Sequence, residues 1–195
     1  MAHAIQGGRV GAGAGHVPRV AARAWYVARV HHDSIRPAVD ADVPEIIGLI
    51  HDLAAYEREP DAVKITEAVL REQLFAEHPR VFATVADAPA WSDHRLAGMA
   101  LWFLTFSTWE GTHSLYLEDL FVRPELRGRG FGKALLTALA QECVTSGYQR
   151  MEWAVLTWNA PSIAFYQSLG AGPMSEWHTY RLAGEALRRL GGAPA

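Results

Sequence analysis

The sequence of 195 residues has one cysteine, little net charge and no long apolar run. A single cysteine rules out a disulfide within the chain and favours an intracellular, cytoplasmic protein. A formal net charge of −3 argues against nucleic acid as the main partner, because phosphate binding needs a basic face. Nothing approaches 18 consecutive apolar residues, so no membrane span is predicted. Half of the residues are hydrophobic, which is enough for one substantial core.

The cysteine and the histidines do not form the patterns that are typical of a catalytic nucleophile or a metal site. Cys143 shares a helix face with Leu135 and Leu139, which favours a small buried hydrophobe over a nucleophile. None of the nine histidines forms H-x-x-x-H or pairs with a nearby cysteine. We therefore expect no metal site.

The first 34 residues differ from the rest in composition. Residues 1–32 hold four arginines, five glycines and no acidic residue. Three of these arginines interrupt every candidate signal-peptide core (Arg19, Arg23 and Arg29). An organelle transit peptide would contain serine or threonine, and neither occurs before Ser34. We expect residues 1–34 to be a disordered extension, and residues 35–190 to be one folded domain.

Beyond residue 34, the apolar spacing alternates between helical and strand periods. Helices are predicted from 42 to about 53 and at 66–75, 130–146 and 160–169. Strands are predicted at 35–38, 81–86, 96–105, 115–122, 150–156 and 177–182. This order is that of a mixed α/β domain.

The first helix has a start signal and an apolar stripe. Asp42 with Glu45 three residues later predicts a capping box. The stripe comprises five residues: Val43, Ile46, Ile47, Ile50 and Leu53.

The most informative stretch is YLEDLFVRPELRGRGFGKALL at 116–136, a strand, an Arg/Gly loop and a helix start. Glycines at a helix N-terminus expose backbone N–H groups, and the helix dipole adds positive charge, so the loop is suited to a pyrophosphate. The spacing excludes a P-loop, because Gly128 and Gly132 are one residue too close and Ala134 replaces the hydroxyl. It also excludes a dinucleotide fingerprint, since Lys133 stands where the third glycine would be. An ordinary surface loop is the alternative.

The R-x-x-G-x-G pattern at 127–132 and the stretch WNAPSIAFYQSLGA at 158–171 resemble the GNAT acetyltransferase superfamily. Further strings resemble its diamine (spermidine/spermine) N-acetyltransferase branch: IRPA at 35–38, AAYE at 54–57, EHP at 77–79, YLEDLFV at 116–122 and EWAVLTWN at 152–159. The resemblance implies a GNAT fold, with a mixed sheet of about six to seven strands and about four flanking helices. It also implies acetyl-CoA as co-substrate, a small amine as substrate, and a homodimer.

By this resemblance, acetyl-CoA contacts come from a splayed strand, the Arg/Gly loop and the start of the next helix. The implied residues are Leu120, Phe121, Val122, Arg127, Gly128, Arg129, Gly130, Phe131, Gly132, Lys133, Asn159 and Ser162.

Two residues are candidates for catalysis. Tyr166 is implied to protonate the leaving thiolate, because a phenol of pKa ~10 stays protonated at neutral pH; the alternative is a core tyrosine. Glu118 is implied to remove a proton from the amine, and the alternative is a structural carboxylate. The strand period of two predicts that Glu118 shares a face with Tyr116 and Leu120. Leu117, Asp119 and Phe121 would lie on the other face, where Asp119 is expected to serve structure.

The implied amine site collects carboxylates and aromatic rings, which suit a diffuse cation. Its residues are Tyr56, Glu57, Trp109, Glu118, Glu152, Trp153 and Glu176; a solvated helix end and packing aromatics are the alternative. The sequence departs from the family at Ser107, where an aspartate is expected, at Thr112 and His113 in a longer loop, and at Ala160. Fewer carboxylates favour a diamine or a lysine analogue over a long polyamine. Alternative functions are a protein N-terminal or lysine acetyltransferase and a non-catalytic acetyl-CoA sensor.

Overall fold

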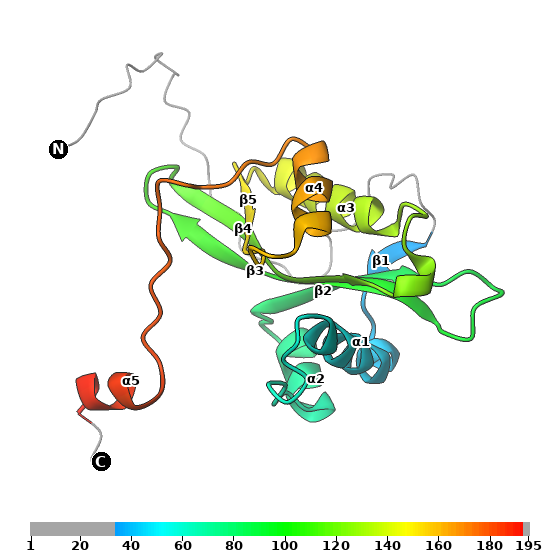
Figure 1. Ribbon diagram of the computed structural model, residues 1–195, viewed down its shortest axis with the longest axis horizontal. Helices are drawn as coiled ribbons and strands as arrows, with labels where there is room; N and C mark the ends of the chain where they lie inside the picture. Colours follow the sequence, from blue (N-terminus) through cyan, green and yellow to red (C-terminus); the bar gives the residue numbers. More distant parts are fainter. Residues whose placement is uncertain (1–33, 193–195) are drawn as a thin grey trace. The chain divides into compact units, whose positions relative to one another are not determined.

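The computed structural model describes residues 34–192 (Figure 1). The chain divides between Trp153 and Ala154, so the described part forms two compact units, residues 34–153 and 154–192. The disordered extension expected at residues 1–34 lies, except for Ser34, outside the described residues. Among residues 34–192, no helix combines the length and the apolar character needed to cross a membrane.

The first unit is built on a mixed five-stranded sheet, in the order β1-β2-β3-β4-β5. Its strands are β1 Ile35–Pro37, β2 Val81–Asp87, β3 Leu96–Ser107, β4 Thr112–Val122 and β5 Met151–Trp153. Neighbours from β1 to β4 run antiparallel, whereas β4 and β5 run parallel. The predicted mixed α/β class is confirmed, with five strands in the described chain where six to seven were expected.

Helices cover both faces of this sheet. The helices of this unit are α1 Val43–Tyr56, α2 Glu67–Phe75 and α3 Phe131–Ser146, with 3-10 turns η1 Asp40–Asp42 and η2 Pro124–Leu126. α1 and α2 lie on one face and α3 on the other (Figure 1). The parallel β4–β5 pair requires a crossover connection, and α3 supplies it.

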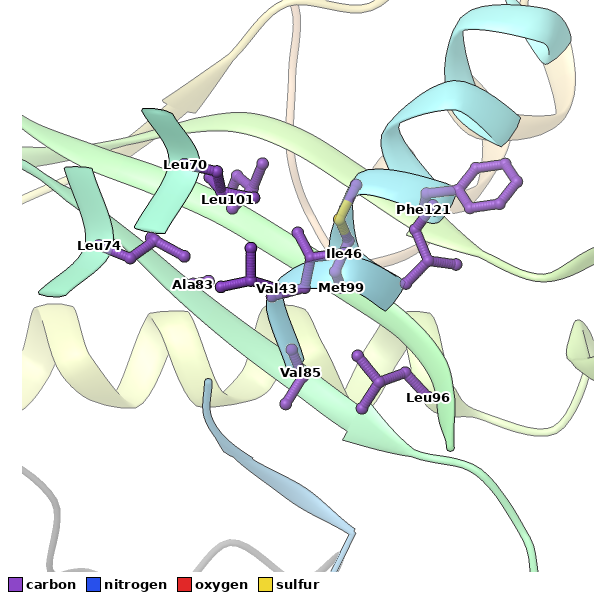
Figure 2. Packing of buried hydrophobic residues seen from close by; sticks show 11 residues of the cluster. Val43, Ile46, Leu70, Leu74, Ala83, Val85, Leu96, Met99, Leu101 and Phe121 are labelled. Carbon is purple, nitrogen blue, oxygen red and sulfur yellow. The ribbon is translucent and has the colours of Figure 1, made fainter. Parts of the chain in front are cut away.

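The core between the sheet and α1 and α2 confirms the predicted stripe. Val43 and Ile46 of the stripe are fully buried against strand residues such as Met99 and Phe121 (Figure 2). Leu49 of α1, which was not predicted, is also fully buried in this cluster. The other predicted stripe residues are partly buried and pack against this cluster (Ile47, Ile50 and Leu53). This packing places the C-terminal end of α1 beside β4.

The predicted capping box at Asp42 is wrong. The Asp42 side chain does not cap α1; it lies fully buried and accepts hydrogen bonds from Arg36 at 2.6 Å and from the Val39 N–H at 2.8 Å. Burial alone would raise the pKa of Asp42, but these hydrogen bonds and the charges of Arg36 and Arg95 lower it below its ordinary value. A buried carboxylate between two arginines gains more from these ion pairs than from capping a helix.

Glu45 also has a different role from the predicted one. One of its carboxylate oxygens accepts a hydrogen bond from the Leu96 N–H at 3.0 Å and another from Arg123 at 3.2 Å. Arg123 donates as well to Asp52 and to the Leu96 carbonyl. Glu45 therefore ties α1 to the end of β4.

The second unit contains α4 Ala160–Ser168 and α5 Gly184–Leu190. The strand predicted at 177–182 is wrong, because those residues belong to no strand and Trp177, Tyr180 and Leu182 are exposed. Strand propensity reflects the fit to a pleated, half-buried surface, and no partner strand supplies one here within the described residues. α5 was not predicted; Glu185 in its first turn and Arg188 in its last turn suit the helix dipole.

Candidate active site

The site is built on the divergence of β4 from β5. The two strands pair only from Leu115, opposite Met151, to Leu117, opposite Trp153. β4 continues to Val122 with β3 alone as its partner. Residues 118–122 therefore have one edge with no neighbouring strand in the described chain, and we call this the open edge.

Strand alternation decides which backbone groups point to the open edge. The Arg123 N–H donates to the Ala97 carbonyl of β3 at 2.9 Å. Because successive N–H groups of a strand point in opposite directions, those of Val122 and Leu120 are directed to the open edge and that of Phe121 to β3. Two of the three backbone amides predicted from the resemblance thus lie on this edge.

A register shift in β4 places Glu118 at a bulge. Leu117 lies opposite Trp102, whereas Asp119 lies opposite Leu101, the next residue of β3. Adjacent residues of β3 face opposite sides of the sheet, so Leu117 and Asp119 do too. The prediction that Leu117, Asp119 and Phe121 share a face is therefore wrong, because an extra residue reverses the alternation. Tyr116 and Leu120, expected on one face, are separated in the same way.

The bulge brings three carboxylates together beside the end of α1. Burial raises the pKa of Asp119 to about 6, with further contributions from the negative charges of Glu118 and Glu57. Burial also raises the pKa of Glu57. Within residues 34–192, none of the three carboxylates accepts a hydrogen bond or forms an ion pair. We call Glu57, Glu118 and Asp119 the carboxylate cluster, and a cation would neutralise it.

Sequence reasoning missed Asp119, which was expected to serve structure on the opposite face. Its carboxylate holds no backbone group in the described chain. The available signal was the pair of adjacent acids in an otherwise apolar strand, YLEDLFV. Asp119 shares the α1-facing side of the sheet with Phe121, as strand alternation predicts, and the bulge places Leu117 on the other side.

The Arg/Gly loop adopts the backbone that its glycines predict. Gly128 has φ 74° and Gly130 has φ 92°, both left-handed. Gly130 is the N-cap residue of α3 and has no side chain to cap it. The first hydrogen bond of the helix is donated by the Ala134 N–H to the Gly130 carbonyl. The N–H groups of Gly132 and Lys133 precede that bond, at the positive end of a 16-residue helix.

The two loop arginines lie over aromatic rings. The Arg127 guanidinium carbon is 4.9 Å from the centroid of the Tyr56 ring, and its Nε donates to the Val122 carbonyl at 2.9 Å. The Arg129 guanidinium carbon lies 4.9 Å from the ring centroid of Trp91. Trp91 belongs to the loop that joins β2 and β3. The resemblance implied acetyl-CoA contacts for both arginines, and the sequence did not predict their contacts with these rings.

The other predicted amine-site residues of the first unit are dispersed. Trp109 is 87% exposed in the turn between β3 and β4. Ser107 shapes that turn, since its hydroxyl accepts a hydrogen bond from the Glu110 N–H at 3.2 Å. In β5, Glu152 pairs with Arg150 at 3.0 Å, and Trp153 lies opposite Leu117. Only Tyr56, beside Glu57, joins the carboxylate cluster region.

The remaining candidates lie in the second unit. The Asn159 side chain caps α4 by accepting a hydrogen bond from the Ser162 N–H at 3.3 Å. Ser162 and Tyr166 are four residues apart on this helix and so share a face. The Tyr166 ring packs on Phe165, with centroids 5.4 Å apart. Glu176 is exposed in a turn between α4 and α5.

Comparison with known proteins agrees with this architecture. The family model described as Acetyltransferase (GNAT) family matches residues 46–171. A thialysine N-epsilon-acetyltransferase of Sus scrofa is 38% identical over 165 residues, covering 81% of this chain and 96% of that protein. An L-ornithine N5-acetyltransferase of Arabidopsis thaliana is 32% identical over 197 residues, covering 80% of this chain and 86% of that protein.

A solved structure shares the fold. An integron cassette protein from the mobile metagenome of V. cholerae superimposes with a TM-score of 0.67 at 27% identity, covering 82% of this chain and 97% of that one. The chain therefore belongs to the GNAT acetyltransferase family and is an acetyl-transferring enzyme that uses acetyl-CoA.

Proposed function

We propose that this enzyme acetylates a primary amine of a small cationic substrate, either a lysine analogue, a diamine or a short polyamine. The observation that carries the proposal is the carboxylate cluster at the bulge, next to the open edge of β4. The names of the relatives, which specify thialysine and L-ornithine, support an amine on a short aliphatic chain.

The residues of the first unit fit acetyl-CoA. The backbone N–H groups of Leu120 and Val122 point to the open edge. They can donate hydrogen bonds to the amide carbonyl groups of the pantetheine arm, which would then occupy the place of a neighbouring strand. The N–H groups of Gly132 and Lys133 suit the pyrophosphate. The bound co-substrate supplies an activated acetyl thioester, and these donors hold it in place before reaction.

The carboxylate cluster is proposed to hold and deprotonate the amine. An ammonium ion near Asp119 and Glu57 gains charge-assisted hydrogen bonds that these acids otherwise lack. Glu118, at the bulge, accepts the amine proton, directly or through water, so that the nitrogen lone pair can attack the carbonyl carbon. Among the remaining candidates, Tyr166 is proposed as the acid that protonates the departing thiolate.

Release of free CoA with a panel of amines tests the proposed function. Thialysine, L-ornithine, putrescine and spermidine are compared with a peptide bearing an N-terminal amine and with a lysine-containing peptide. We expect thialysine or L-ornithine to give the highest kcat/KM. Higher activity with either peptide would favour a protein acetyltransferase, and CoA binding with no turnover of any amine would favour a sensor.

The resemblance further leads us to propose a cytoplasmic homodimer. Light scattering at micromolar concentration should give twice the chain mass. A monomer mass would reject the dimer without affecting the proposed chemistry.

A further inference from the structure

The side chain of Arg127 bridges three elements of the first unit. Its Nε–H donates to the Val122 carbonyl at the end of β4, 2.9 Å away. Its guanidinium carbon lies 4.9 Å from the ring centroid of Tyr56, in the last turn of α1, and 5.3 Å from that of Phe121. The arginine itself opens the Arg/Gly loop, so one side chain connects that loop, the open edge and the C-terminal end of α1.

Both ends of this bridge lie at functional positions. The Arg123 N–H donates to β3, and adjacent residues of a strand direct their backbone groups to opposite edges. The N–H and the carbonyl of Val122 therefore both point to the open edge. Tyr56 immediately precedes Glu57, whose charge contributes to the raised pKa of Asp119. A displacement of the loop at Arg127 would therefore be transmitted through its guanidinium group to the C-terminal end of α1 and to the carboxylate cluster, whereas the Arg123 ion pairs hold α1 further from that end.

Arginine is suited to this geometry and lysine is not. A planar guanidinium stacks on a ring face while donating in its own plane, whereas an ammonium group is a compact point charge. A phosphate contact alone would require only the positive charge. The three contacts of Arg127 use the shape of the group as well as its charge.

We propose that Arg127 is a positioning residue that couples acetyl-CoA binding at the open edge to the placement of Tyr56 and Glu57, and so to amine binding. The inference rests on the proposed function of the open edge and the carboxylate cluster. Coupling of this kind is reciprocal, so a change at α1 must alter the affinity of the cofactor site through Arg127.

A double-mutant cycle on CoA binding tests this coupling without knowledge of the amine. CoA itself is the probe, measured by calorimetry on the full chain. Arg127→Lys should weaken CoA binding about tenfold, since the hydrogen bond and the stacking geometry are both lost. Tyr56→Leu should weaken it about fivefold although Tyr56 belongs to α1. The double variant should bind within about twofold of Arg127→Lys alone.

Two further comparisons separate positioning from a general structural effect. Tyr56→Phe keeps the ring and should bind CoA more tightly than Tyr56→Leu. Arg127→Met, which lacks the charge, should be within about threefold of Arg127→Lys, because geometry rather than charge is lost. Arg80→Lys, at an exposed arginine before β2, is the matched control, and melting curves establish that each variant is folded.

The outcomes are distinct. Additive losses for Arg127→Lys and Tyr56→Leu, or parental CoA affinity in Tyr56→Leu, would overturn the coupling. Near-parental affinity of Arg127→Lys with a large loss in Arg127→Met would identify Arg127 as a phosphate charge instead, and this comparison needs no change at Tyr56. A parent chain that does not bind CoA would reject the proposed function and the coupling with it.

Discussion

Gly98 of β3 packs so closely on Phe121 of β4 that a Cβ at position 98 would overlap the Phe121 carbonyl oxygen. The same Cβ would lie 3.0 Å from the Cα of Val122. The glycine is thus required by the close approach of two backbones. It also fixes the end of β4 on which the open edge depends.

Gly98→Ala should therefore move the end of β4 and weaken CoA binding. Overpacking of this kind costs about 1–3 kcal/mol of stability. The matched control is Gly48→Ala, at an exposed position of α1 with no atom within 4 Å of the added Cβ. That control should gain about 0.5–1 kcal/mol, as expected for alanine in a helix. Denaturant melts and CoA calorimetry on both variants measure the difference.

Gly130→Val should abolish CoA binding in a domain that still folds. The left-handed φ of 92° is unfavourable for a β-branched residue, so the loop backbone must change. Gly147→Val, at the other end of α3, introduces a similar strain at φ 74°. The control should lose comparable stability but keep its CoA affinity. Equal CoA affinity in the Gly130 variant and the parent would show that the loop is not the pyrophosphate site.

The raised pKa of Asp119 makes stability depend on pH in a defined window. The folded protein retains the Asp119 proton up to about pH 6, whereas the unfolded chain loses it near 3.8. Folding stability therefore falls as pH rises from about 4 to 6, by up to about 3 kcal/mol for this group. Asp119→Asn should raise the melting temperature at pH 7 and not at pH 4.

Melts of Asp119→Asn and its control between pH 4 and 7.5 provide the measurement. Asp93→Asn, at an exposed loop position, is the control and should show no pH-dependent difference from the parent. If the two substitutions shift the melting temperature equally at every pH, Asp119 is not the group responsible. The Asp119 variant should also raise the KM for the amine, because a cation partner is removed.

Glu118 and Tyr166 should differ in their pH profiles. Tyr166→Phe removes the proposed acid and should lower kcat by about 10²–10⁴-fold at every pH. Glu118→Gln should recover partly as pH rises toward the pKa of the amine, because bulk water then takes over deprotonation. The measurement is kcat/KM against pH for both variants and the parent. Parallel profiles would reject this division of roles, and a fully active Tyr166→Phe would remove Tyr166 from the mechanism.

A chain that begins at Ser34 should melt within a few degrees of the full-length protein. Residues 1–32 have no apolar periodicity with which to dock on the domain. Thermal melts and CoA-release assays on both chains provide the measurement. A large loss of stability or activity would show that the extension packs on the domain.

Local sequence signals predicted the elements well and their pairing less well. The stripe through Val43 and Ile46 and the glycines of the Arg/Gly loop each determine a local conformation, and both predictions were confirmed. The bulge at Glu118 depends on how β3 and β4 align, which neither strand specifies alone. The ring contacted by Arg127, that of Tyr56, lies far from it in the sequence, so no local pattern predicts the contact. Asp42 was predicted as a helix cap, but its ion pair with Arg36 competes with that role.

The open edge of β4 also bears on how the protein behaves without its co-substrate. Unpaired strand edges are templates for intermolecular pairing, and natural proteins usually cover or charge them. If the open edge binds acetyl-CoA as proposed, it must stay free of a partner strand between turnovers. Saturating CoA would cover this edge and so suppress association between the sheets of different molecules. It would also raise thermal stability by mass action. Shelf life and yield of the purified protein should therefore depend on CoA in the buffer.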